Sequence, residues 1–227
     1  MTAERSHVSE QRLDAAAALR ALAHAFVAHD ADDAVLSRLA EFARETVAEL
    51  RAGARRDRAS ALRAEALFAI GDTGVLEVRP AGTGDPFSVM ADRAVAGRAN
   101  PTAAEIDVRY DGEEAVATVT FGAAFEGAPG RAHGGIVAAV FDDVTGYVLR
   151  VAGTPAFTGR IAITYHAPTP IGVPLEFRSR LAGREGRRLV ITADCRRRRD
   201  LIASCEATYV TVDAQQFQRL VADVSRQ

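Results

Sequence analysis

The N-terminal part of the chain places apolar residues at a helical spacing. They return every three or four positions, as at Leu36, Leu39, Phe42 or Ala43, Val47 and Leu50, within segments rich in Ala, Leu, Arg and Glu. This spacing puts them on one face of a helix and predicts two or three amphipathic helices. We therefore expect residues 1–71 to form a helical segment that packs on the rest of the protein or on a neighbouring subunit.

The pattern changes twice after this segment. Gly and Pro become frequent between residues 72 and 104, which predicts a largely irregular connection with one short strand at 75–79. Beyond Pro101 the period of the apolar residues becomes two, as in strands. Strands are expected at 106–110, 115–121, 156–166, 174–181, 187–196 and 201–212, and the domain that holds them at 105–213, followed by a short C-terminal helix at 214–227.

One long helix interrupts these strands. Residues 136–151 are apolar nearly all round, which predicts a buried helix. The strands on either side of it are joined mostly by short turns. The sequence therefore predicts an α+β protein in which an antiparallel sheet wraps around a central helix.

Two adjacent carboxylates, Asp142 and Asp143, lie in the middle of this helix. An ionised carboxylate in apolar surroundings costs several kcal/mol unless it is paired or reaches water. Neighbouring helical positions lie about 100° apart, so the two side chains must face different surroundings. Asp142 continues a helical stripe of small residues, namely Gly135, Ala138, Ala139, Thr145 and Gly146. We expect Asp142 to face a cleft and Asp143 to be a rim or salt-bridge residue.

The helix opens at "HGG", residues 133–135. Backbone N–H groups at a helix start have no partner within the helix, and the helix dipole favours negative charge there. A carboxylate base about two turns from such donors is suited to adding water to an acyl carbonyl. Gly134 and Gly135 could instead merely permit a tight turn, and His133 could be only a hydrogen-bonded structural group.

Composition and charge narrow the functional classes. Twenty-eight Lys and Arg against thirty Asp and Glu give a formal net charge of -2, so no strong overall field recruits nucleic acid or an acidic membrane. The chain starts without the apolar core of a signal peptide and holds no apolar run able to span a bilayer, which predicts a cytoplasmic protein. Cys195 and Cys205 have no metal-type spacing and are expected to stay thiols.

Two blocks of the sequence, "EGAPGRAHGG" and "FTGRIAITYHAPTPIG", resemble a known family. Their order, spacing and context are similar to those of hot-dog-fold acyl-CoA thioesterases of the PaaI type, over roughly residues 103–212. The resemblance implies a hot-dog fold and hydrolysis of an acyl-CoA thioester, with no metal and no cofactor beyond the coenzyme A of the substrate. It also implies a site completed across a homodimer, and dimers of this family often pair into a homotetramer.

The resemblance assigns roles by position. Asp142 lies nine residues after His133 and takes the place of the family's general base or nucleophile. The Gly134 N–H would bind the thioester oxygen, and the carboxylate that acts on the same thioester would come from the other subunit. His133 would fix the geometry of the N–H donor. Thr158, sixteen residues after Asp142, would hold the water or the carboxylate, although a Thr in a strand is also an ordinary sheet former.

Substrate contacts depart from the family pattern at two positions. Gly127 stands where relatives carry Asn, so Glu126 is the candidate replacement for a carbonyl contact, while Gly135 heads the small-residue stripe along which a thin ligand could approach. Ala167 stands where a basic residue is usual, which leaves His166 as the nearest candidate for a phosphate contact.

Four consecutive arginines, Arg196, Arg197, Arg198 and Arg199, cannot all continue a strand whose inner face packs on a helix. They should lie in or beside a hairpin turn before Asp200, either simply solvated or in contact with the phosphates of coenzyme A. RNA binding ranks last, because no stacking aromatic residues interleave with the charge.

Two alternatives to a thioesterase remain open. A hot-dog hydratase or dehydratase is disfavoured, because those enzymes usually carry His five residues after the helix Asp and this chain has Tyr147. A non-catalytic acyl-CoA-binding or scaffold protein is disfavoured by the intact Asp142 and Gly134, but the sequence does not exclude it.

Overall fold

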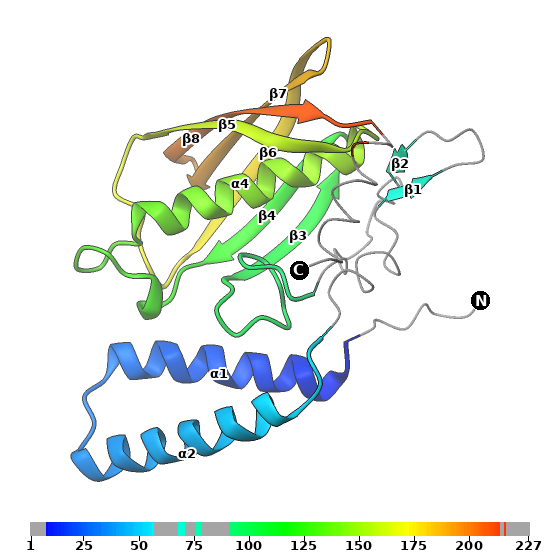
Figure 1. The fold of residues 1–227 in the computed structure, drawn as a ribbon. Helices are drawn as coiled ribbons and strands as arrows, with labels where there is room; N and C mark the ends of the chain where they lie inside the picture. The colour runs from blue at the N-terminus through cyan, green and yellow to red at the C-terminus, as the bar shows by residue number, and fades with distance from the viewer. Residues whose placement is uncertain (1–7, 57–67, 71–75, 79–90, 214–215, 217–227) are drawn as a thin grey trace.

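The computed structural model describes residues 8–56, 68–70, 76–78, 91–213 and 216 (Figure 1). Two N-terminal helices, α1 (Glu10–Ala28) and α2 (Asp33–Ala52), lie on one side of a body made of a sheet and a helix. Each begins at a side chain that accepts a backbone N–H of the first turn, Ser9 for α1 and Asp32 for α2. The expected third helical stretch before residue 71 and the expected C-terminal helix lie largely outside the described residues.

The body is a six-stranded antiparallel sheet wrapped around one long helix, α4 (Gly134–Val151). The strands lie in the order β3-β4-β6-β7-β8-β5. Their bounds are β3 Glu105–Asp111, β4 Glu114–Thr120, β5 Ala156–Tyr165, β6 Pro174–Glu185, β7 Arg188–Arg197 and β8 Asp200–Thr211. A short 3-10 helix, η1 (Ala123–Phe125), precedes α4, and a separate two-stranded sheet pairs β1 (Phe68–Ile70) with β2 (Leu76–Val78). This arrangement is the hot-dog fold, as the sequence predicted.

The core lies between α4 and the inner face of the sheet. Alternate residues of β7 point inward, as the period of two requires, and are buried: Leu189, Ile191, Ala193 and Cys195. From α4 the fully buried Phe141 meets Phe177 of β6 edge to face, with ring centroids 5.0 Å apart. None of the helices in the described part of the chain combines the length and apolarity that crossing a membrane requires.

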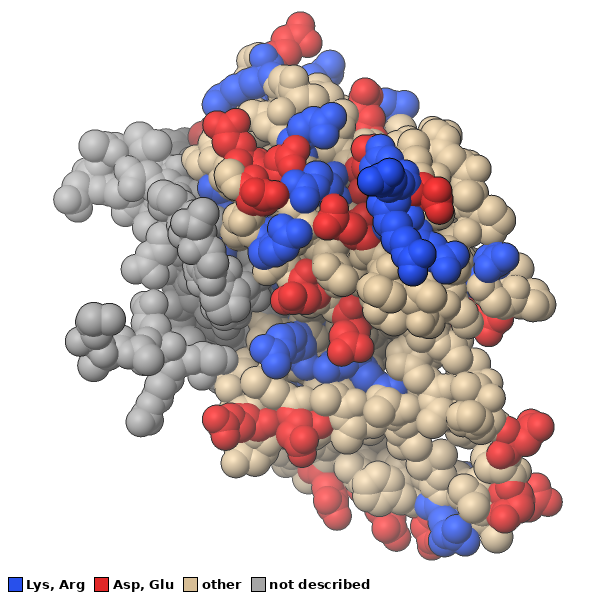
Figure 2. Space-filling view, turned by 180° about the vertical axis from the view of Figure 1, so that it is seen from behind, with Lys and Arg blue, Asp and Glu red and all other residues tan. Residues whose placement is uncertain are grey.

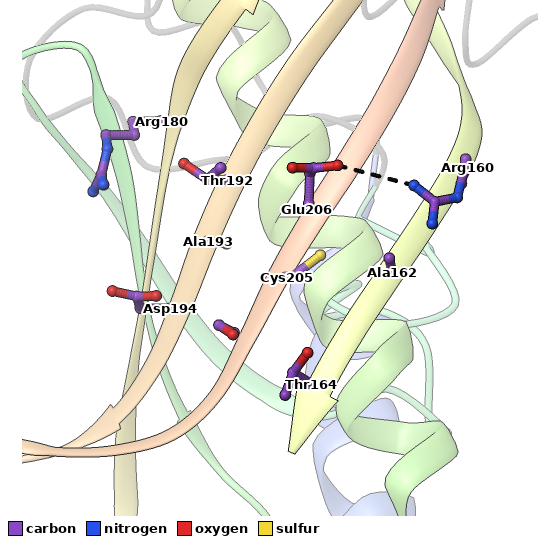
Figure 3. A pocket seen from close by; sticks show the side chains of 10 residues that line it. Arg160, Ala162, Thr164, Arg180, Thr192, Ala193, Asp194, Cys205 and Glu206 are labelled. Atoms are coloured by element: carbon purple, nitrogen blue, oxygen red, sulfur yellow. Dashed lines mark ion pairs between the residues drawn. The ribbon is translucent and has the colours of Figure 1, made fainter. Parts of the chain in front are cut away.

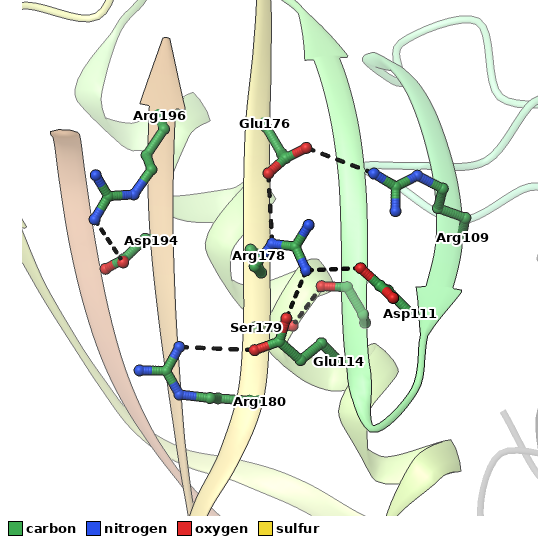
Figure 4. Close-up of polar contacts among 10 residues, drawn as sticks. Arg109, Asp111, Glu114, Glu176, Arg178, Ser179, Arg180, Asp194 and Arg196 are labelled. Carbon is green, nitrogen blue, oxygen red and sulfur yellow. Dashed lines mark hydrogen bonds and ion pairs between the residues drawn. The ribbon is translucent and has the colours of Figure 1, made fainter. Parts of the chain in front are cut away.

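The outer face of the sheet is charged, with acidic and basic side chains interspersed (Figure 2). Arg178 of β6 forms its centre, since its guanidinium lies 2.6 Å from Glu114, 3.0 Å from Asp111 and 3.4 Å from Glu176 (Figure 4). These hydrogen bonds raise the pKa of Arg178 above its ordinary value. The alternation of charge across neighbouring strands explains why this face can stay in water while the other face packs on α4.

Candidate active site

The start of α4 presents a backbone donor. His133 caps the helix, because its Nδ1 accepts the Gly135 N–H at 3.0 Å, and its own N–H donates to the Phe125 carbonyl at 2.8 Å. The Tyr165 hydroxyl of β5 donates to the Gly134 carbonyl at 2.6 Å and fixes the first turn from the other side. No described residue accepts a hydrogen bond from the Gly134 N–H. A donor held on both sides and left unused can bind an anionic oxygen.

The loop before the helix is closed by its own residues. The Glu126 carboxylate accepts the Gly130 N–H, and the Gly127 N–H donates to the Arg131 carbonyl at 2.9 Å. A Cβ at position 127 would lie 2.9 Å from the His133 Cα. The departure at Gly127 therefore has a physical reason, since a larger residue would displace the capping histidine. Glu126 closes this turn with the carboxylate that the sequence offered for substrate contact.

Asp142 and Thr158 meet across α4 and β5. The Thr158 hydroxyl donates to Asp142 Oδ1 at 2.9 Å. A β-bulge makes this possible, because Thr158 pairs with Tyr209 while Arg160 pairs with Thr208, leaving Gly159 as the extra residue. In a regular strand residues 158 and 160 would share the outer face, so the bulge turns Thr158 toward the helix.

The backbone of Asp142 is also held. The Tyr209 hydroxyl donates to the Asp142 carbonyl at 3.0 Å and lies 2.8 Å from the Thr145 hydroxyl. Burial raises the pKa of Tyr209, so it stays a neutral donor. Tyr165 lies in the second block that resembles the family, but the sequence indicated no role for it. Tyr209 did not stand out, because it is simply an aromatic residue in a strand.

The burial of the two aspartates differs from the sequence expectation. Asp142 is exposed within one chain, whereas Asp143 is half-buried, with its side chain 13% exposed. Asp143 lies 3.5 Å from the Arg93 guanidinium and accepts the Tyr147 hydroxyl at 3.0 Å, which agrees with its interpretation as a salt-bridge residue. Burial raises the pKa of Asp143, and Arg93 and Tyr147 oppose that rise. The helix was expected to be buried all round, but along its small-residue stripe Gly135 and Asp142 are exposed, Ala138, Ala139 and Gly146 are half-buried, and Thr145 is buried.

One chain does not bring Asp142 and the Gly134 N–H together. They lie eight residues apart on the same helix, which corresponds to about 12 Å at about 1.5 Å per residue. A thioester carbonyl is far shorter than this, so the two groups of one chain cannot serve one carbonyl. Among the described residues, no group of three or more His, Cys, Asp or Glu side chains is arranged to hold a metal ion.

The basic residues that are candidates for phosphate binding lie away from Asp142 and Gly134. The arginine run forms the β7–β8 hairpin turn, with Arg197 paired to Asp200 and Arg198 in the left-handed region at a φ of 56°. Arg196 is committed to Asp194 at 3.2 Å, whereas Arg197, Arg198 and Arg199 are exposed. His166 is exposed and its Nε2 lies 2.8 Å from the Ser204 hydroxyl.

A hollow of about 440 Å³ lies on the outer face of the sheet, lined by residues of β5 to β8 that include Arg160 and Glu206, 3.9 Å apart (Figure 3). It contains none of the candidate catalytic residues. We place the candidate site on the helix face of β5, where the oriented donor and the held carboxylate lie.

Part of the sequence, and the fold, are similar to those of known proteins. Residues 129–203 match the family model of the thioesterase superfamily. The sequence has no match among curated proteins. The fold is similar to that of the thioesterase superfamily protein RHA08564, with a TM-score of 0.68 and 23% identity over 91% of this chain and 97% of that one.

Two further solved structures are similar over about half of this chain. The E. coli PaaI protein from the phenylacetic acid degradation operon has 19% identity and a TM-score of 0.44, over 47% of this chain and 79% of that one. The smu.793 protein of Streptococcus mutans bound to acetyl CoA has 19% identity and a TM-score of 0.46, over 48% and 90%. Residues 129–203 thus match the thioesterase superfamily, and the hot-dog fold of this chain is similar to that of a solved protein of this superfamily.

Proposed function

We propose that this protein hydrolyses an acyl-CoA thioester to the free acid and coenzyme A. The observation that carries the proposal is the hydrogen bond between Thr158 and Asp142, which holds an exposed carboxylate on the stripe of small residues. The unused Gly134 N–H at the start of the same helix supplies the second requirement, a donor for the carbonyl oxygen.

The chemistry follows from these two groups. The thioester carbonyl oxygen accepts the Gly134 N–H, and a well-placed donor of this kind stabilises the developing negative charge by about 3 kcal/mol. Asp142 either attacks the carbonyl carbon directly or takes a proton from a water that does so. In the first route an anhydride between the acyl group and Asp142 forms as the C–S bond breaks, and water then hydrolyses this anhydride to the free acid and Asp142. In the second route water adds to the carbonyl carbon and the C–S bond then breaks. In both routes coenzyme A leaves as a thiolate that takes up a proton.

A second copy of the chain completes the site in this proposal. Because Asp142 and the Gly134 N–H of one chain are about 12 Å apart, each carboxylate needs the helix start of another chain. The strand β5 offers the surface for this pairing, since it is a sheet edge with Phe157 50% and Tyr165 47% exposed. A twofold arrangement around β5 would also cover the small-residue stripe and remove Asp142 from bulk water.

The substrate's nucleotide fits the arginine turn. Coenzyme A carries phosphates, which guanidinium groups bind well. Arg197 and Arg199 are exposed and form no ion pair with the residues that the structure describes. His166 is hydrogen-bonded to Ser204 and Arg196 forms an ion pair with Asp194, so we expect these two residues to contribute less to phosphate binding.

A panel of acyl-CoA thioesters of increasing chain length tests the proposal, with the released thiol measured by a disulfide reagent. The protein's own thiols should add little background, because burial raises the pKa of Cys195 and of Cys205 to about 12. We expect turnover of at least one thioester by the native protein and its loss in Asp142→Asn. Binding of coenzyme A with no turnover of any panel member would instead identify a non-catalytic acyl-CoA-binding protein.

A further inference from the structure

Helix α1 contacts the segment that leads into the candidate oxyanion turn. His24 of α1 accepts the Ala124 N–H on its Nδ1 at 3.0 Å, and its ring lies edge-on to Phe125 with centroids 5.1 Å apart. Both partners belong to η1. Acceptance at Nδ1 requires the imidazole proton to be on Nε2, so His24 acts here as a neutral acceptor.

Gly122 makes room for this histidine. A Cβ at position 122 would lie 2.5 Å from His24 Nδ1, and its three nearest atoms would all belong to the His24 ring. The backbone of Gly122 has a φ of -89° and a ψ of 179°, which any residue can adopt. The glycine is therefore required by the close approach of His24 and not by its backbone conformation.

The contact continues from η1 to the start of α4. The Phe125 carbonyl, one residue after Ala124, accepts the His133 N–H at 2.8 Å. His133 in turn accepts the Gly135 N–H on its ring. His24, η1 and the capping histidine thus form one continuous path of short contacts that ends beside the Gly134 N–H.

We propose that His24 is a positioning residue for the oxyanion donor, through which α1 becomes part of the catalytic unit. The inference rests on the proposed thioesterase function and assigns His24 no contact with substrate. A second anchor keeps α1 in place when His24 is changed, because Arg20 donates to the carbonyls of Arg98 at 3.0 Å and Asn100 at 2.8 Å. A His24 variant therefore loosens the turn without releasing the helix.

A double-mutant cycle of His24→Ala and Gly122→Ala in the full chain tests the proposal. Each single change should lower kcat by about tenfold with KM within about twofold, because a displaced donor weakens only the transition state. The double variant should lose little more than either single one, since removing the ring leaves room for the new methyl group. His24→Asn, whose side-chain oxygen can accept the Ala124 N–H, should retain kcat within about threefold.

The matched control is His29→Ala, an exposed histidine at the C-terminal end of the same helix, which should leave kcat unchanged. Strictly additive losses in the cycle, or a His24→Ala variant with native kcat, would overturn the role of His24. Hydrogen–deuterium exchange of residues 122–135 gives a readout that needs no substrate, and His24→Ala should accelerate it. If the native protein hydrolyses no thioester while this acceleration is seen, the proposed function fails and the coupling of α1 to the turn stands. Unchanged exchange would refute the coupling itself.

Discussion

The Thr158 hydroxyl donates to Asp142 Oδ1 across 2.9 Å, joining the edge strand β5 to the central helix. This bond fixes the rotation of the carboxylate and leaves Oδ2 for a water or for the thioester carbon. It depends on the bulge at Gly159, without which Thr158 would face the outside of the sheet. A local irregularity in one strand thereby determines the orientation of the candidate catalytic group.

Replacing Asp142 by Asn should lower kcat by at least about a hundredfold, because the amide keeps the shape of the side chain but can neither attack nor accept a proton. Steady-state kinetics on the best thioester of the panel measures this. The neighbouring Asp143→Asn is the control and should cost far less, since Asp143 faces Arg93 on the other side of α4. Equal losses in the two variants would show that the wrong aspartate has been assigned.

Replacing Thr158 by Val removes the hydroxyl while keeping the branched shape that suits a strand. We expect kcat to fall by about tenfold, because Asp142 loses the bond that orients it. Thr158→Ser should restore most of the activity. Thr164→Val, an exposed position of the same strand near its other end, is the matched control, and an equal loss there would contradict a specific role for Thr158.

Periodicity predicted the sheet and the helix because a period of two or of 3.6 is a property of each segment alone. The relation between His133, Asp142 and Thr158 could be predicted only through the family resemblance, which carries tertiary information. Two features were beyond the sequence. Which side of α4 the sheet covers decides that Asp143 is more buried than Asp142, and helical spacing alone does not indicate this. The approach of His24 to Gly122 joins segments about a hundred residues apart, so neither the helical nor the strand periodicity of a single segment could indicate it.

Assembly can be tested directly. Light scattering at micromolar concentration should show at least a dimer, because one edge of β5 is unpaired and Gly135 and Asp142 of the small-residue stripe are exposed in one chain. Ala139→Arg places a long charged side chain on that stripe and should give a monomer without turnover. Ala182→Arg, at an exposed position of β6, should remain dimeric and active. A native protein that is monomeric and still active would rule out the shared site.

The ionisation of Asp143 should appear in the pH dependence of stability. Burial raises the pKa of Asp143 in the folded state above its ordinary value of 3.8. At any pH between 3.8 and the raised pKa, the folded state therefore binds more protons than the unfolded state. The free energy of unfolding that Asp143 contributes must therefore fall as pH rises through this interval. Urea unfolding of the native protein and of Asp143→Asn from about pH 3.5 to about pH 7 measures it. Their difference should decline with rising pH and then level off, and a flat difference would refute the raised pKa.

Binding of the coenzyme A phosphates by the β7–β8 turn can be separated from binding of the acyl group. The double variant Arg197→Ser/Arg199→Ser removes two exposed guanidinium groups and spares Arg196, which pairs with Asp194, and Arg198, whose φ of 56° sets the turn. We expect KM for an acyl-CoA to rise by at least about tenfold with kcat unchanged, because each lost charge-assisted hydrogen bond is worth about 1.5–3 kcal/mol. With the matching acyl-pantetheine thioester, which lacks the nucleotide, KM should not change.

Arg184→Ser/Arg188→Ser, at the exposed β6–β7 hairpin, is the control for this prediction. It removes the same charge and should leave both KM values as they are. A similar rise for the pantetheine substrate, or in this control, would mean that the turn makes no specific contact with the phosphates and that the arginines act only through the overall charge of the protein.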